Sequence, residues 1–93
     1  MRISTHPGAI IKEELEACGL SANKFARLID VSANRVTESI RERRSVTAET
    51  ALRLARYFGG SAEFWLRLQM HHDLGKARVE HEENINKSKG CTR

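Results

Sequence analysis

Apolar side chains recur along most of this chain at the three- and four-residue intervals that place them on one face of an α-helix. Short polar stretches interrupt this pattern, and valine and isoleucine are too scattered to form the alternating runs of a β-strand. Proline occurs only once, at Pro7, so long helices are permitted. The sequence therefore predicts an all-α protein of five helices without a sheet.

Each expected helix is bounded by residues that start or stop helices. The first runs from Gly8 to Cys18, because Pro7 suits a first turn and Gly19 suits a helix end. A serine or threonine able to cap the first turn precedes each later helix. These capping residues are Ser21, Ser32, Thr47 and Ser61, and the helices that follow them span 22–29, 33–41, 48–58 and 62 onward. Residues 1–6 are expected to form a short extended arm.

The second and third expected helices are short and are joined by a tight corner. Ala26 is small at the point where the two helices must cross closely. Asp30 stands at the corner, where a positive φ is often needed and aspartate tolerates it. Val31 and Val36 would fill the angle between the helices. The combination is typical of a helix-turn-helix; the alternative is an ordinary corner between two helices of a small helical domain.

The outward side of the third expected helix carries polar groups of the kind that read base edges in the major groove. Asn34 could make a paired contact to adenine, and Thr37 could contact a base or a thymine methyl group. Ala33 could do only the latter. Glu38 could accept a hydrogen bond from cytosine, or it could repel phosphates and sharpen the register.

Further residues around this helix are candidates for contacts with DNA, although a solvated surface is the alternative for each charged one. Arg35 lies to the side of the helix, from which it could reach a base or a phosphate. Three arginines at the end of the helix and just after it resemble phosphate clamps, and two polar residues at helix starts could donate to the DNA backbone. The complete set predicted to meet DNA is Asn23, Ser32, Ala33, Asn34, Arg35, Thr37, Glu38, Arg41, Arg43 and Arg44.

The apolar residues of the last two helices differ in extent. The stripe expected for the fourth helix comprises Ala48, Ala51, Leu52, Ala55 and Phe58. The fifth helix is apolar over a wider arc than packing on one small core requires. This surplus predicts either a dimer interface, which is the main candidate, or a helix wedged between two others within one chain. The residues assigned to the dimer interface are Leu66, Met70 and Leu74.

Beyond Gly75 the chain is polar, mixed in charge and poor in large apolar residues. A helical extension to about Glu83, followed by ten disordered residues, is expected. Residues 1–75 are therefore assigned to the helix-turn-helix domain, including its fifth helix, and residues 76–93 to a polar C-terminal extension.

Composition narrows the class of protein. A chain of 93 residues has room for one domain, and its net charge of +4 favours a polyanionic partner, although many inert small proteins are as basic. No apolar run approaches the roughly 20 residues of a membrane-spanning helix, and the N-terminus lacks the apolar core of a signal peptide. Cys18, on an apolar face, and Cys91 form no CxxC pair, so a reducing, cytoplasmic setting is the simplest interpretation.

Nothing in the sequence indicates an enzyme or a bound cofactor. The four histidines share no metal-ligand spacing with a cysteine or a carboxylate pair on one helix face. His71 and His72 are adjacent, so they point about 100° apart on a helix. There is no glycine-rich phosphate loop, and Trp65 is assigned to the core rather than to a ligand platform.

The run 44–74, with its segments ALRLARYFG and EFWLRLQ, is the part of the chain most typical of a known family. Together with His6-Pro7-Gly8 and the helix-turn-helix, it makes the chain resemble the HigA-type (VapI-like) antitoxins of the Xre/lambda-repressor-like helix-turn-helix family. The resemblance covers residues 6–74. It implies a compact five-helix lambda-repressor-like domain.

The resemblance also implies a function that composition and spacing do not. Such antitoxins are encoded beside a small RelE-like (HigB-type) toxin that cuts mRNA on the ribosome, and they neutralise it. They bind a palindromic operator in double-stranded DNA, repress their own operon and are usually homodimers. Two alternatives remain: a stand-alone helix-turn-helix regulator, and a toxin-binding module that does not bind DNA.

The chain departs from the family pattern at three points. Asp30 stands where the corner residue is commonly glycine, and Ser39 stands where an apolar residue is frequent. Glu42-Arg43-Arg44 replaces the usual Gly-Lys-Arg. A left-handed conformation at Glu42 would cost roughly 1 kcal/mol.

Overall fold

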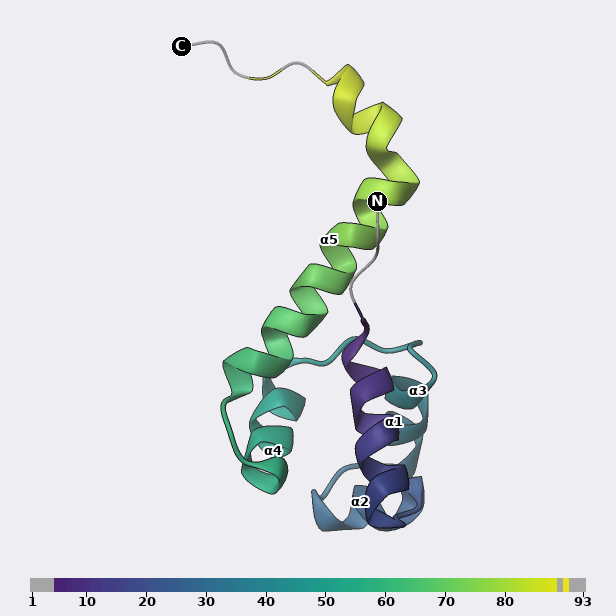
Figure 1. The fold of residues 1–93 in the computed structure, drawn as a ribbon, viewed down its shortest axis with the longest axis vertical. Helices are drawn as coiled ribbons and strands as arrows, with labels where there is room; N and C mark the ends of the chain where they lie inside the picture. The colour runs from purple at the N-terminus through teal and green to yellow at the C-terminus, as the bar shows by residue number, and fades with distance from the viewer. Residues whose placement is uncertain (1–4, 89, 91–93) are drawn as a thin grey trace.

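The computed structural model describes residues 5–88 and 90, and this part of the chain folds into five α-helices without a β-strand. The helices are α1 (Pro7–Cys18), α2 (Ala22–Leu28), α3 (Ala33–Ile40), α4 (Ala48–Phe58) and α5 (Ala62–Lys87). α3 packs on both α1 and α2, α4 packs chiefly on α5, and α5 runs on beyond the other helices (Figure 1). The predicted all-α, five-helix fold is confirmed.

The four predicted capping residues start their helices. The side-chain oxygens of Ser21, Ser32, Thr47 and Ser61 each accept a hydrogen bond from the backbone N–H three residues later. This bond satisfies one of the N–H groups that a first turn leaves without a partner. α1 begins at Pro7 and is terminated by Gly19, whose φ of 68° is left-handed.

His6 has the extended backbone that was expected, with φ −68° and ψ 139°, but it is packed into the fold rather than part of a separate arm. It is only 4% exposed, and its Nδ1 accepts a hydrogen bond from the Gly8 N–H at 2.9 Å, so it caps α1. Its ring also lies edge-on to the ring of His72 in α5, with the ring centroids 4.8 Å apart. The sequence does not reveal this burial because the covering residue comes from the other end of the fold. Residues 1–4 of the predicted arm lie outside the described residues.

A single core draws on all five helices and on Val46 in the α3–α4 connection. The ring of Phe25 stacks on that of Phe58 with centroids 5.5 Å apart, and Phe58 lies 5.9 Å from Trp65. These rings link α2, α4 and α5, and they confirm the assignment of Trp65 to the core. The buried apolar residues are Ile11, Leu15, Phe25, Ala26, Ile29, Val36, Val46, Ala51, Leu54, Ala62 and Trp65.

The buried face of α4 differs from the predicted stripe. Leu52 is 64% exposed and Ala48 is also exposed, whereas Leu54 and Thr50 are buried. The apolar residues of α4 cover two overlapping arcs, so periodicity alone does not decide which arc faces the core. Cys18, expected on the apolar face of α1, is exposed as well.

α5 continues past its predicted end at Glu83 to Lys87, so positions 84–87 are helical rather than disordered. Lys76 and Glu80, one turn apart, form an exposed ion pair of 4.0 Å earlier in the same helix. The expectations for residues 89 and 91–93, Cys91 among them, lie outside the described residues. Among the helices described, none combines the length and hydropathy of a membrane-spanning segment.

Candidate nucleic-acid interface

α2 and α3 meet at a corner built as a Schellman helix end. The Val31 N–H donates to the Ala26 carbonyl oxygen at 2.9 Å. The Asp30 N–H donates to the Arg27 carbonyl oxygen at 3.3 Å, and Asp30 adopts a left-handed φ of 58°. Ala26 is 1% exposed, as a close crossing of two helices requires. The predicted helix-turn-helix and its corner residue are confirmed.

The same kind of helix end follows α3 and sets the direction of the arginines beyond it. The Arg43 N–H donates to the Glu38 carbonyl oxygen at 2.9 Å, and the Glu42 N–H donates to the Ser39 carbonyl oxygen at 3.0 Å. Glu42 adopts a φ of 61°, so the left-handed conformation considered for this position is present. The exposed arginines of this turn are Arg41, Arg43 and Arg44.

Four residues predicted to read bases lie on the first two turns of α3. Ala33 and Asn34 are exposed in the first turn, and Thr37 and Glu38 are half-buried in the second. None of the four makes a side-chain hydrogen bond or ion pair among the described residues. The polar groups of Asn34, Thr37 and Glu38 and the methyl group of Ala33 therefore remain available to a ligand placed along α3.

The remaining predicted contacts have different surroundings. Asn23 is exposed in the first turn of α2. The Ser32 hydroxyl accepts a hydrogen bond from the Arg35 N–H at 3.2 Å and so caps α3. The hydroxyl can still donate its proton to a further acceptor while it accepts this bond.

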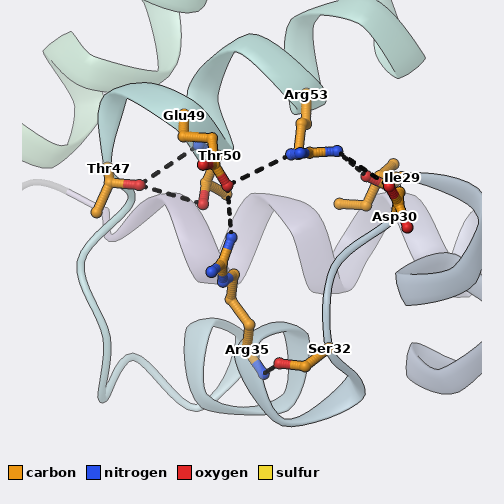
Figure 2. A network of polar contacts seen from close by, with 8 residues as sticks. All are labelled: Ile29, Asp30, Ser32, Arg35, Thr47, Glu49, Thr50 and Arg53. Carbon is orange, nitrogen blue, oxygen red and sulfur yellow. Dashed lines mark hydrogen bonds and ion pairs between the residues drawn. The ribbon is translucent and has the colours of Figure 1, made fainter.

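The Arg35 side chain points toward α4, where it enters a network of polar contacts (Figure 2). Its Nη1 donates to Glu49 Oε1 at 2.9 Å, and the same oxygen lies 3.5 Å from Arg53 Nε. Arg53 Nη1 in turn donates to the Ile29 carbonyl oxygen at 2.9 Å and lies 4.0 Å from Asp30 Oδ2. One carboxylate of α4 therefore joins α3 to the corner that ends α2.

Two cations hold the Glu49 carboxyl in its charged form. The hydrogen bond from Arg35 and, next, the positive charge of Arg53 lower the pKa of Glu49. The sequence marks Glu49 only as a first-turn acid that suits the helix dipole. Its four-residue spacing from Arg53 was a signal of pairing, but only the fold brings Arg35 to the same carboxylate.

Gln69 of α5 is a further polar residue that the sequence pattern does not single out. It is 6% exposed, and its Oε1 accepts a hydrogen bond from the Val46 N–H at 2.8 Å. Its Nε2 donates to Asp73 Oδ1 at 2.9 Å. Gln69 therefore fastens the α3–α4 connection, which begins with the exposed arginines, onto α5.

The three residues predicted to form a dimer interface do not share one environment. Leu66 is half-buried and packs against the core, whereas Met70 and Leu74 are exposed. Val79 and Ile85 are exposed further along the same helix. Apolar surface therefore continues along α5 beyond the globular part of the fold.

This combination, two short helices with a polar second helix and arginines just beyond it, defines a helix-turn-helix protein. Comparison with known proteins agrees: the helix-turn-helix family matches residues 11–65. Virulence-associated protein I of Dichelobacter nodosus is 49% identical over 82 residues, which are 87% of this chain and 75% of that protein.

Solved structures are similar over nearly the whole chain. A HigA-family addiction module antidote protein from Coxiella burnetii matches with a TM-score of 0.90 and 40% identity, over 98% of this chain and 100% of that chain. The Pseudomonas aeruginosa antitoxin HigA, solved with the higBA promoter, matches with a TM-score of 0.88 and 35% identity, over 96% and 99% of the two chains.

The chain therefore belongs to the Xre-like helix-turn-helix family and has the fold of the HigA-type antitoxins within it. Members of this family are transcription regulators and antitoxins, not enzymes.

Proposed function

We propose that this protein is an antitoxin that represses its own operon by binding a palindromic operator with α3. The observation that carries the proposal is the exposed first turn of α3, which includes Asn34. The corner at Asp30 fixes the orientation of this helix relative to α2. Two relatives of known structure support the proposal, because one is a HigA-family antidote protein and another was solved with promoter DNA. Sequence reading would then depend on Asn34 and Thr37.

The arginines after α3 would supply the electrostatic part of binding. Arg43 and Arg44 follow Glu42 in an exposed turn, and Arg41 precedes it. Phosphate contacts of this kind position a protein on DNA without reading its sequence. We propose that these arginines bind the DNA phosphates beside the groove that α3 enters. Asn23 and Ser32, at the starts of α2 and α3, would donate hydrogen bonds to the same DNA backbone.

A palindromic operator requires two copies of the chain related by two-fold symmetry. We assign the contact between copies to α5, where Met70 and Leu74 are exposed and Leu66 adjoins the core. Light scattering at micromolar concentration is expected to give the mass of a dimer. A monomeric mass would contradict this assignment.

The partner that the antitoxin neutralises would be a RelE-like (HigB-type) toxin encoded beside it. The support is family membership, since antitoxins of this type are paired with such toxins. A short neighbouring reading frame for a basic protein, whose product co-purifies with this chain, is the expected finding. Its absence would favour a stand-alone regulator.

Fluorescence anisotropy tests the DNA-binding part of the proposal. The DNA upstream of the gene and a scrambled duplex of equal length would be titrated over a salt series. Tight, selective binding that weakens steeply as salt rises is expected, because phosphate contacts release counterions. Equal, weak binding to both duplexes would overturn operator recognition and leave the toxin as the partner to test.

A further inference from the structure

The first turn of α3 contains two polar residues, of which one is free to bind a ligand and the other is bound within the protein. Asn34 is exposed and unpaired within the described residues, whereas the adjacent Arg35 is turned toward α4 and bound to Glu49. A helix-turn-helix presents this turn to the DNA. An unrestrained arginine there would pair readily with the phosphates of any sequence.

We propose that Glu49 is a positioning residue that withholds Arg35 from DNA phosphates and so limits sequence-independent binding. This inference rests on the proposed function, because it assumes that α3 faces DNA. It assigns Arg35 to the protein's own architecture instead of to a base or phosphate contact. It also gives α4, which lies outside the helix-turn-helix, a part in DNA selection.

The geometry shows why Glu49 can hold an arginine in competition with phosphate. Its Oε1 is shared by Arg35 Nη1 at 2.9 Å and Arg53 Nε at 3.5 Å (Figure 2). Arg53 is itself anchored on the Ile29 carbonyl oxygen at the end of α2. Arg53 therefore keeps a second positive charge beside the carboxylate, and a side chain that is already restrained by one partner loses less conformational entropy when it pairs with another.

The ion pair between Arg35 and Glu49 is accessible to solvent, so Glu49 can compete with a DNA phosphate for Arg35. The side chains of Arg35 and Glu49 are 33% and 62% exposed, so Arg35 could turn outward if its partner were removed. Restraint matters because a phosphate contact strengthens binding to every DNA sequence alike. A genome offers a very large excess of such competing sites.

Glu63 provides a matched control for the test. Glu49 and Glu63 are both the second residue of a helix, follow a capped start and are exposed. Among the described residues, Glu63 forms no ion pair. Replacing either residue by alanine removes one negative charge and one first-turn acid, but only the change at Glu49 releases Arg35.

The experiment measures the affinity of the full chain for a scrambled duplex between 50 and 200 mM salt. Glu49→Ala is expected to steepen the slope of log affinity against log salt by about 0.9 for each additional phosphate that the protein neutralises. For one additional phosphate, the ratio of the Glu49→Ala affinity to the wild-type affinity should be roughly 3.5-fold larger at 50 mM than at 200 mM salt. Glu63→Ala is expected to leave the slope unchanged, and so is Glu49→Ala made in an Arg35→Gln background.

Three results would overturn the inference. The first is that Glu49→Ala changes the salt slope no more than Glu63→Ala does, and the second is that Glu49→Ala still changes the slope in the Arg35→Gln background. The third is that Arg35→Gln alone flattens the slope by the same amount, because Arg35 would then already bind phosphate in the wild-type protein. Thermal melts monitored by circular dichroism show whether each variant folds. If Glu49→Ala does not fold, Glu49→Gln takes its place because it removes the negative charge that competes with phosphate, and Glu63→Gln becomes its control. The salt dependence of binding to the scrambled duplex is sufficient to test this inference. Selectivity of the wild-type protein for its operator separately decides the proposed function.

Discussion

Gly8 of α1 lies directly against the backbone carbonyl of Ser39 in α3. A Cβ atom placed on Gly8 would overlap the Ser39 carbonyl oxygen, and Ser39 itself is buried. The two helices therefore touch through their backbones at this point. This close approach accounts for a glycine directly after Pro7.

Gly8→Ala is expected to destabilise the protein even though alanine favours helices more than glycine does. The added methyl group must push α1 away from α3, and overpacking of this kind costs about 1–3 kcal/mol. Urea denaturation would measure the loss. Ala9→Gly, one residue along the same turn, reports what a change between alanine and glycine costs in this turn of the helix. A Gly8→Ala variant as stable as wild type would show that the contact is not tight.

Glu42→Gly is expected to stabilise the protein slightly. Left-handed strain at Glu42 costs about 1 kcal/mol, whereas the extra freedom of an unfolded glycine costs about 0.5–1 kcal/mol, so relief of strain should win by up to about 0.5 kcal/mol. Glu38→Gly, within the helical part of α3, makes the same chemical change without any strain to relieve. It should lose about 1 kcal/mol. Equal losses at the two positions in thermal melts would contradict the prediction.

His6 should make stability fall in mild acid. Burial and, next, the charge of His72 lower the pKa of His6, so the folded state favours its neutral form. The stability that neutral His6 contributes to the folded state is fully present above its unfolded-state pKa of about 6.5. It is lost as the pH falls from that value toward the lowered pKa of His6 in the folded state.

The matched variant is His6→Asn, because asparagine can still cap α1 but does not titrate. Urea denaturation between pH 5 and 8 should show a steeper acid loss for wild type than for His6→Asn. The difference in slope is at most about 1.4 kcal/mol per pH unit, the limit for one proton. Parallel profiles would exclude His6 as the source.

Gln69→Leu should loosen the α3–α4 connection. It leaves the buried Val46 N–H without its acceptor, a loss of about 1–3 kcal/mol. Hydrogen exchange at the Val46 amide should accelerate, while the exposed substitution Arg67→Leu on the same helix leaves it unchanged. Unaltered protection of Val46 in Gln69→Leu would mean that another group accepts this bond.

Two substitutions should separate base reading from phosphate binding. Asn34→Ala is expected to lower affinity for the operator by about 1–3 kcal/mol while leaving scrambled DNA unaffected. Arg43→Ala should weaken both duplexes alike and flatten the salt slope by about 1. Anisotropy titrations distinguish the two patterns, and the assignments would be wrong if each variant lost affinity in the pattern expected of the other.

The local structure of this protein follows from its amino-acid sequence alone. Ser21, Ser32, Thr47 and Ser61 cap helices in the structure because each side-chain oxygen needs only an N–H three residues later as its partner. The corner at Asp30 was predictable for a similar reason, since only a few residue types tolerate a left-handed φ. Such features depend on neighbours within a few positions, and a linear pattern contains them.

The pairs of residues that meet across the fold depend instead on how the helices pack. The burial of His6 against His72, the capture of the Val46 N–H by Gln69 and the turn of Arg35 toward Glu49 join separate helices. The stripe predicted for α4 was wrong for the same reason, because it included the exposed Leu52 and omitted the buried Leu54. A helix pattern reports that a side chain can be buried, but packing against the other helices determines which side chain is and what it touches.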